Sequence, residues 1–147
     1  MTSMACSEAP FYRQDQNTPN GWSLNQPIVF TIQDPIDTPS DVYIHLRNDA
    51  SYPFSNIFLI ANLRVNDSLI SSDTLEYAMA KPNGEWLGTG FTSVKESKLW
   101  WKENWQAQLP PPYTVEIAQA NRVNGREKAA PQLAGIVSVG VSINSRE

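Results

Sequence analysis

The segment DVYIHLRND, residues 41–49, alternates apolar and polar side chains over most of its length. Successive side chains of a β-strand point to opposite faces, so Val42, Ile44 and Leu46 would share one face of a strand. Tyr43, His45 and Arg47 would share the other. This pattern is typical of a strand with one face in a hydrophobic core, and it predicts a β-rich fold.

The same alternation recurs along the chain, with turn-forming residues such as Asn83-Gly84 and Asn124-Gly125 between the runs. The further runs are residues 28–32, 75–77, 113–117 and 137–143. Residues 57–65 are more continuously apolar, and we expect them to form a central strand covered on both faces. Residues 97–105 and 128–133 are expected to form short helical turns.

Strands separated by turns, without a long helical stripe, predict an all-β fold. We expect an antiparallel β-sandwich of the jelly-roll type, with a partly closed barrel as the alternative. The 147 residues suffice for one domain with its own core. Residues 1–25 are interpreted as an N-terminal tether, and residues 26–147 as a single sandwich domain.

The charge balance and hydropathy exclude some classes of partner. The net charge is −4, and a general nucleic-acid binder would need a basic face. No apolar run reaches the roughly 20 residues of a membrane-spanning helix.

Residues 73–104 concentrate glycine and tryptophan. Three of the seven glycines lie between positions 84 and 90, and four of the five tryptophans lie in or just beyond the segment. Such rings are either core or contact surface. Adjacent Trp100 and Trp101 would point to opposite sides of a strand, so at most one of the two would be displayed. We predict an interaction surface made from Trp86, Phe91, Lys95, Lys98, Trp100, Trp101, Lys102 and Trp105.

This segment also resembles a known family. The blocks DTLEY, PNG, LGTGF, KESKLW and KEN of residues 73–104 are similar to GldH, a lipoprotein family associated with bacterial gliding motility and type IX secretion. PNGW at 19–22, IHLRND at 44–49, and YTVEI and LAGI further on extend the resemblance over nearly the whole chain. It implies a non-enzymatic, membrane-anchored cell-envelope lipoprotein, on the periplasmic side or at the outer membrane. It would act as an accessory component of a gliding or secretion assembly, with other envelope proteins as its partners.

Cys6 is the only cysteine, so the chain cannot form an internal disulfide. Ala5 precedes it and a polar, proline-bearing stretch follows, an arrangement that suits a lipidated N-terminus. On its own, the residue is more readily interpreted as an incidental thiol near a chain end, and the family resemblance reverses that preference. The resemblance implies that Cys6 is the lipid attachment site and that residues 1–25 are a lipoprotein tether whose leader is absent. Residues 1–5 would then be either the clipped end of a leader or residues added for expression.

The sequence contains no convincing catalytic or metal-binding set. His45 is the only histidine, whereas catalytic triads and most zinc sites need histidine with correctly placed partners. No calcium-loop or phosphate-loop motif is present, although calcium held by scattered backbone oxygens stays open. We therefore predict no enzymatic activity and no cofactor.

Two alternatives remain. One is a carbohydrate-binding sandwich that uses exposed tryptophans, so that glycans would be partners. The other is a small glycosidase, which requires two carboxylates facing one cleft within about 10 Å. Its candidate carboxylates are Glu76, Glu85, Glu96, Glu103 and Glu116.

Overall fold

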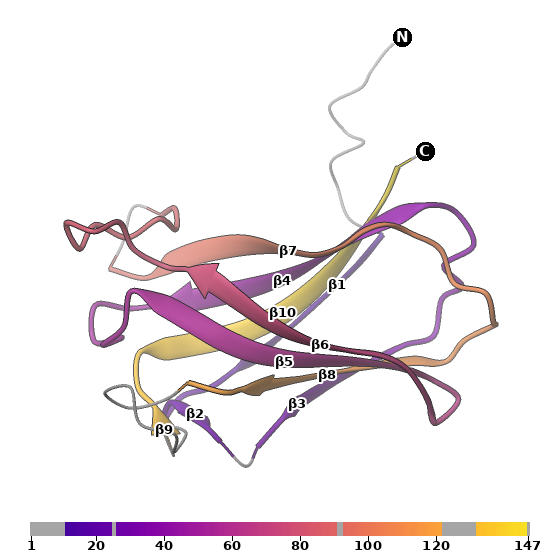
Figure 1. Ribbon diagram of the computed structural model, residues 1–147, viewed down its shortest axis with the longest axis horizontal. Helices are drawn as coiled ribbons and strands as arrows, with labels where there is room; N and C mark the ends of the chain where they lie inside the picture. Colours follow the sequence, from indigo (N-terminus) through magenta and orange to yellow (C-terminus); the bar gives the residue numbers. More distant parts are fainter. Residues whose placement is uncertain (1–10, 25, 91–92, 122–131, 147) are drawn as a thin grey trace, which may run out of the picture.

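A computed structural model describes residues 11–24, 26–90, 93–121 and 132–146 of the chain. These residues form strands and turns without any helix, and two four-stranded antiparallel sheets pack face to face (Figure 1). None of them lies in a helix of the length and apolar character needed to cross a membrane.

The strands divide between two sheets and a short ribbon. The first sheet has the order β1-β10-β4-β7, with β1 at Tyr12–Asn17, β10 at Ile136–Ser145, β4 at Ser40–Asn48 and β7 at Lys95–Trp105. The second has the order β3-β8-β5-β6, with β3 at Ile28–Ile32, β8 at Tyr113–Gln119, β5 at Asn56–Val65 and β6 at Ser68–Ala78. The ribbon pairs β2 (Trp22–Ser23) with β9 (Gln132–Leu133).

The core lies between the sheets and is built by the alternation seen in the sequence. On β4, Ile44 and Leu46 are fully buried and belong to the same hydrophobic core as apolar residues of the second sheet, among them Leu59 of β5. Fully burying a Leu or Ile side chain contributes about 1.5–3 kcal/mol, so these inward rows supply much of the driving force for folding. The predicted all-β antiparallel sandwich is confirmed, whereas the jelly-roll subtype stays a prediction.

Two predicted elements differ from the structure. β5 is a central strand, but only alternate residues are buried, and Ile60 on its outer face is 36% exposed. The prediction that both faces are covered is therefore wrong, because no other layer of described residues packs on the outer face of the second sheet. Residues 97–105 form part of β7 and no helical turn, since β7 pairs with β4 from Ser40↔Trp105 to Asn48↔Lys95. Of the second expected turn, 128–131 lie outside the described residues, and Gln132–Leu133 form β9.

The sandwich also includes residues from the segment that we interpreted as a tether. β1 pairs with β10 from Tyr12↔Ile143 to Asn17↔Ser138. Trp22 of β2 is 1% exposed and belongs to the core. The ordered domain thus begins earlier in the chain than the boundary drawn at residue 26.

Candidate functional site

The tryptophans of β7 are separated by the alternation of the strand. Trp100 points outward from the first sheet and is 52% exposed. Trp101 packs against the core, and its Nε1 donates a hydrogen bond to Asp73 Oδ2 on β6 at 2.9 Å. The two indoles therefore have different roles, and only Trp100 is available to a partner.

Trp100 is supported by its neighbours on the outer face. The register places it opposite Tyr43 of β4, and the two ring centroids are 4.6 Å apart at an interplanar angle of 54°. Lys98 Nζ lies 4.3 Å from the centroid of the Tyr43 ring, a cation–π geometry. We call Trp100, Tyr43 and Lys98 the Trp100 patch.

One end of the patch is bounded by an ion-pair cluster. Arg146 Nε lies 2.8 Å from Asp41 Oδ1, and Arg146 Nη2 lies 3.2 Å from Glu103 Oε2. Burial works to raise the pKa of Asp41, but a backbone hydrogen bond from Asn104 and the Arg146 guanidinium outweigh it, and the pKa is lowered. Asp41 therefore stays ionised at neutral pH.

A second ion-pair cluster lies further along the outer face and centres on Glu96 of β7. Arg47 Nε lies 3.1 Å from Glu96 Oε1, and Arg13 Nη2 lies 3.3 Å from Glu96 Oε2. Burial opposes ionisation of Glu96, but these two arginines prevail and lower its pKa. Arg13 also donates two hydrogen bonds of 2.9 and 3.1 Å to Asp15 on the same strand. Its ion pair with Glu96 connects β1 across the sheet to β7.

His45 of β4 lies within this second cluster, in an arrangement that superficially suggests a catalytic triad. Its Nε2 is 2.6 Å from Ser142 Oγ, and its Nδ1 is 3.4 Å from Glu96 Oε2. Burial, followed by the charge of Arg13, lowers the pKa of His45. Ser142 is only 2% exposed, so a substrate carbonyl has no access to its hydroxyl in this arrangement. The group fits a structural polar network better than a nucleophilic centre.

The other residues of the predicted surface are distributed differently. The Trp86 ring is half-buried with its centroid 6.2 Å from that of Tyr52, and Trp105 meets Tyr113 edge-on at 6.4 Å. Lys95 Nζ donates to Gly90 O at 2.6 Å. Lys102 Nζ lies 3.4 Å from Asp73 Oδ2 and 5.2 Å from the centroid of the Trp101 ring. Cys6 and Phe91 lie outside the described residues.

The surface that the fold assembles is therefore smaller than the sequence indicated, because Trp86, Trp101 and Trp105 pack against the core. The sequence reasoning also missed Tyr43. Its signal was the alternation of residues 41–49, which already put Tyr43 on the outer face.

The carboxylates proposed for glycoside hydrolysis each have a polar or cationic neighbour. The partner is Asn56 for Glu76, Lys81 for Glu85, Arg13 and Arg47 for Glu96, Arg146 for Glu103, and Arg64 for Glu116. The described part of the chain contains no group of three or more His, Cys, Asp or Glu side chains that could hold a metal ion.

Comparison with known proteins gives a consistent result. The family model described as GldH lipoprotein matches residues 10–143. A gliding motility lipoprotein GldH homolog of Christiangramia forsetii is 48% identical over 107 residues, which cover 73% of this chain and 66% of that protein, just under two thirds of its length. The gliding motility lipoprotein GldH of Flavobacterium johnsoniae is 32% identical over 144 residues, covering 97% of this chain and 89% of the relative.

Among solved structures, dimeric latent PorU from Porphyromonas gingivalis aligns with 93% of this chain and 13% of its own. The TM-score is 0.29 and the identity 11%, a likeness that carries no argument about fold or function.

Proposed function

The chain belongs to the GldH lipoprotein family, and from this premise we propose that it is an accessory component of a gliding motility or type IX secretion assembly. It performs no bond-breaking chemistry and acts by binding other envelope proteins. The observation that carries the proposal is an exposed tryptophan on an otherwise polar sheet face.

Membrane attachment in this proposal takes place through Cys6, in the cell envelope on the periplasmic side or at the outer membrane. A thioether-linked diacylglycerol with a further amide-linked acyl chain holds firmly, because each buried methylene contributes about 0.8 kcal/mol. The five residue steps from Cys6 to Phe11 span at most about 18 Å. The end of the sandwich where β1 begins is therefore held close to the bilayer.

The Trp100 patch is the docking surface in this proposal. Interface hot spots are enriched in Trp and Tyr, sit at the centre of a contact and are surrounded by polar residues that exclude water. Trp100 is more than half exposed, Tyr43 holds its ring, and the Arg146 cluster lies beside the pair. The partner surface would present an apolar pocket for the indole with polar groups around it.

The test compares Trp100→Ala with Leu69→Ala in the full-length lipoprotein, expressed with a leader peptide in the gliding host. Leu69 is 51% exposed and lies on β6 of the other sheet, so it controls for the loss of exposed apolar surface. Removing a hot-spot tryptophan costs about 2 kcal/mol or more, which is about a 30-fold loss of affinity.

We expect Trp100→Ala to abolish both colony spreading and the crosslink to a neighbouring envelope protein, and Leu69→Ala to preserve both. Far-ultraviolet circular dichroism confirms that both variants fold. Normal spreading and an unchanged crosslinking pattern in Trp100→Ala would refute the docking surface.

In the carbohydrate-binding alternative, Trp100 is the stacking surface, because it is the most exposed of the described tryptophans. It requires that oligosaccharides quench the fluorescence of the wild-type protein and not that of Trp100→Ala. An unchanged signal over a broad glycan panel would dispose of it.

A further inference from the structure

A cleft opens along one side of the sandwich, between the outer strands of the two sheets. β1 is one of the two edge strands of the first sheet, and β3 is one of the two edge strands of the second (Figure 1). No described strand pairs with the free edge of either. A pocket of about 300 Å³ lies between them. Its lining comes from residues 12 and 14–16 of β1 and from residues 29–31 of β3, and its one charged residue, Asp15, is paired with Arg13. Gln16 also lines a second pocket of about 490 Å³ at the end of β1. We call these two pockets together the β1–β3 cleft.

β1 turns neutral polar side chains toward this cleft. Gln14 and Gln16 are paired with Val141 and Val139, which are fully buried, so all four residues lie on the core-facing side of the first sheet. Both glutamines are nevertheless exposed, because the sheets are open at this edge. Edge strands are commonly protected by inward-pointing charges. Here the inward residues are uncharged, so that protection is missing.

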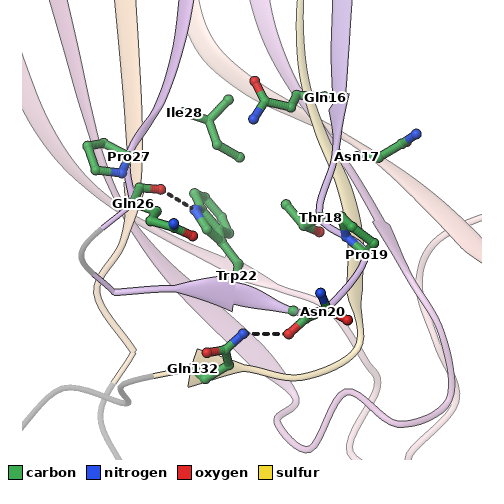
Figure 2. A pocket seen from close by; sticks show the side chains of 11 residues that line it. Gln16, Asn17, Thr18, Pro19, Asn20, Trp22, Gln26, Pro27, Ile28 and Gln132 are labelled. Carbon is green, nitrogen blue, oxygen red and sulfur yellow. Dashed lines mark hydrogen bonds between the residues drawn. The ribbon is translucent and has the colours of Figure 1, made fainter.

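The larger pocket is lined entirely by uncharged residues, and several of its carboxamides are unused (Figure 2). Within the described residues, the side chains of Gln16, Asn17, Asn20 and Gln26 make no hydrogen bond to another residue. Each carboxamide offers donors and an acceptor together. The pocket therefore suits a neutral ligand that carries donors and acceptors in pairs.

The walls of the larger pocket are fixed in place. Trp22 Nε1 donates to Gln26 O at 3.1 Å, and the indole is 1% exposed. Thr18 Oγ1 donates to Ile136 O at 2.5 Å, and Gln132 Nε2 donates to Asn20 O (Figure 2). A site of this kind loses little conformational freedom when it binds.

Saccharides and the polypeptide backbone are two neutral classes of ligand that carry paired donors and acceptors. Saccharide sites commonly offer an exposed aromatic face, but here Trp22 is 1% and Phe30 3% exposed, and Tyr12 is half-buried. A strand edge, in contrast, presents a row of backbone N–H and C=O groups that an extended peptide can pair with. The observations therefore favour a polypeptide.

We propose that the β1–β3 cleft binds one extended segment of a partner protein that adds as a strand to the free edge of β1. The segment carries no charged side chain on the face turned to the carboxamides. The six residues of β1 span about 20 Å at 3.3 Å per residue, so about six residues of the partner are engaged. β1 and β7 are opposite edges of the first sheet, so this surface is distinct from the Trp100 patch.

The experiment uses the full chain and a phage-displayed library of random linear dodecapeptides. A selected sequence is synthesised with blocked ends, its dissociation constant is measured by calorimetry, and the protein is followed by ¹⁵N NMR. We expect the side-chain NH₂ signals of Gln16, Asn17 and Gln26 to shift on titration. Methylating alternate backbone nitrogens of the peptide should weaken binding at least tenfold, because it removes the donors that strand pairing needs.

Gln16→Glu replaces a neutral carboxamide with a charge of the same shape and should also weaken binding at least tenfold. Gln108→Glu makes the same change at an exposed site outside the cleft and should have no effect. Trp100→Ala should leave the peptide affinity unchanged, which separates this test from that of the proposed function.

The inference is overturned if no peptide is selected, if backbone methylation or Gln16→Glu leaves the affinity unchanged, or if the NMR shifts map elsewhere. It is also overturned, in favour of a saccharide, if N,N′-diacetylchitobiose shifts the same NH₂ signals and no peptide does.

Discussion

Replacing Gly140 with alanine should destabilise the protein through one identifiable overlap. Gly140 is at the centre of β10, between Asp15 of β1 and His45 of β4 in the register. A Cβ atom at this position would overlap Asp15 Oδ1, and it would lie 2.8 Å from Asp15 Cγ and 2.9 Å from Gln14 O. Glycine is thus favoured here because the Asp15 side chain lies across it and the Gln14 carbonyl is close by.

The expected cost has two parts. Asp15 can rotate away, but it then loses its hydrogen bonds to Arg13, and an exposed pair of this kind is worth about 0.2–1 kcal/mol. The carbonyl of Gln14 is part of the β1 backbone and can give way only if the strand shifts by a few tenths of an ångström. Overpacking of this type costs about 1–3 kcal/mol. For a domain of this size, the melting temperature should fall by roughly 3–10 °C.

The assay is urea denaturation followed by tryptophan fluorescence, with Ser138→Ala as the matched control. Ser138 lies on the same strand and face as Gly140, and this change adds no atom. Because the overlap is partly with a side chain, Asp15→Ala should recover part of the loss when combined with Gly140→Ala. A Gly140→Ala protein within about 0.3 kcal/mol of wild type, or a double mutant whose losses simply add, would refute the reasoning.

Four further predictions concern the polar network, two turns and an edge strand. His45 has a lowered pKa in the folded state, so the unfolded chain takes up its proton first and the free energy of unfolding should fall as the pH drops below about 6.5. In urea titrations, the free energy of unfolding should differ less between pH 7.5 and pH 5.5 for His45→Gln than for the wild-type protein. Gly135→Ala should cost about 3 kcal/mol or more in thermal melts, because φ is +88° and a Cβ would overlap a neighbouring backbone. Gly84→Ala, at φ +91° with nothing within 4 Å of the new Cβ, should cost only about 1 kcal/mol. Trp101→Phe removes the indole hydrogen bond to a carboxylate on β6 and should lower the free energy of unfolding by about 1 kcal/mol, measured in urea.

The outer face of the first sheet shows where reading the sequence succeeds and where it stops. Period-two alternation placed Tyr43 on the other face of the strand from Val42 and Ile44, and it placed Trp100 and Trp101 on different faces. The structure bears out both predictions. Alternation alone does not tell which strand lies next to which. The contact between Tyr43 and Trp100 depends on the pairing of β4 with β7, strands that are about 50 positions apart.

Two of the wrong predictions, those for β7 and β1, have the same origin. Residues 97–105 were expected to form a short helical turn, but pairing with β4 makes them part of β7. β1 was placed in a tether because residues 7–26 lack a clean alternation and contain Pro10, Pro19 and Gly21. Five of the six residues of β1 are polar. An edge strand of this composition becomes visible only through its partner, β10.

By itself, the sequence determined the all-β class, the inward rows of the main strands and the family, because side-chain alternation and short motifs are local properties of the chain. The tertiary structure alone decided which ring is exposed, that Glu96 joins Arg13 and Arg47, and that β1 and β3 leave a cleft between them whose larger pocket has an uncharged lining. These features arise from strand pairing and sheet packing between residues far apart in the chain. Their free energies depend on burial and distance, which no local pattern specifies.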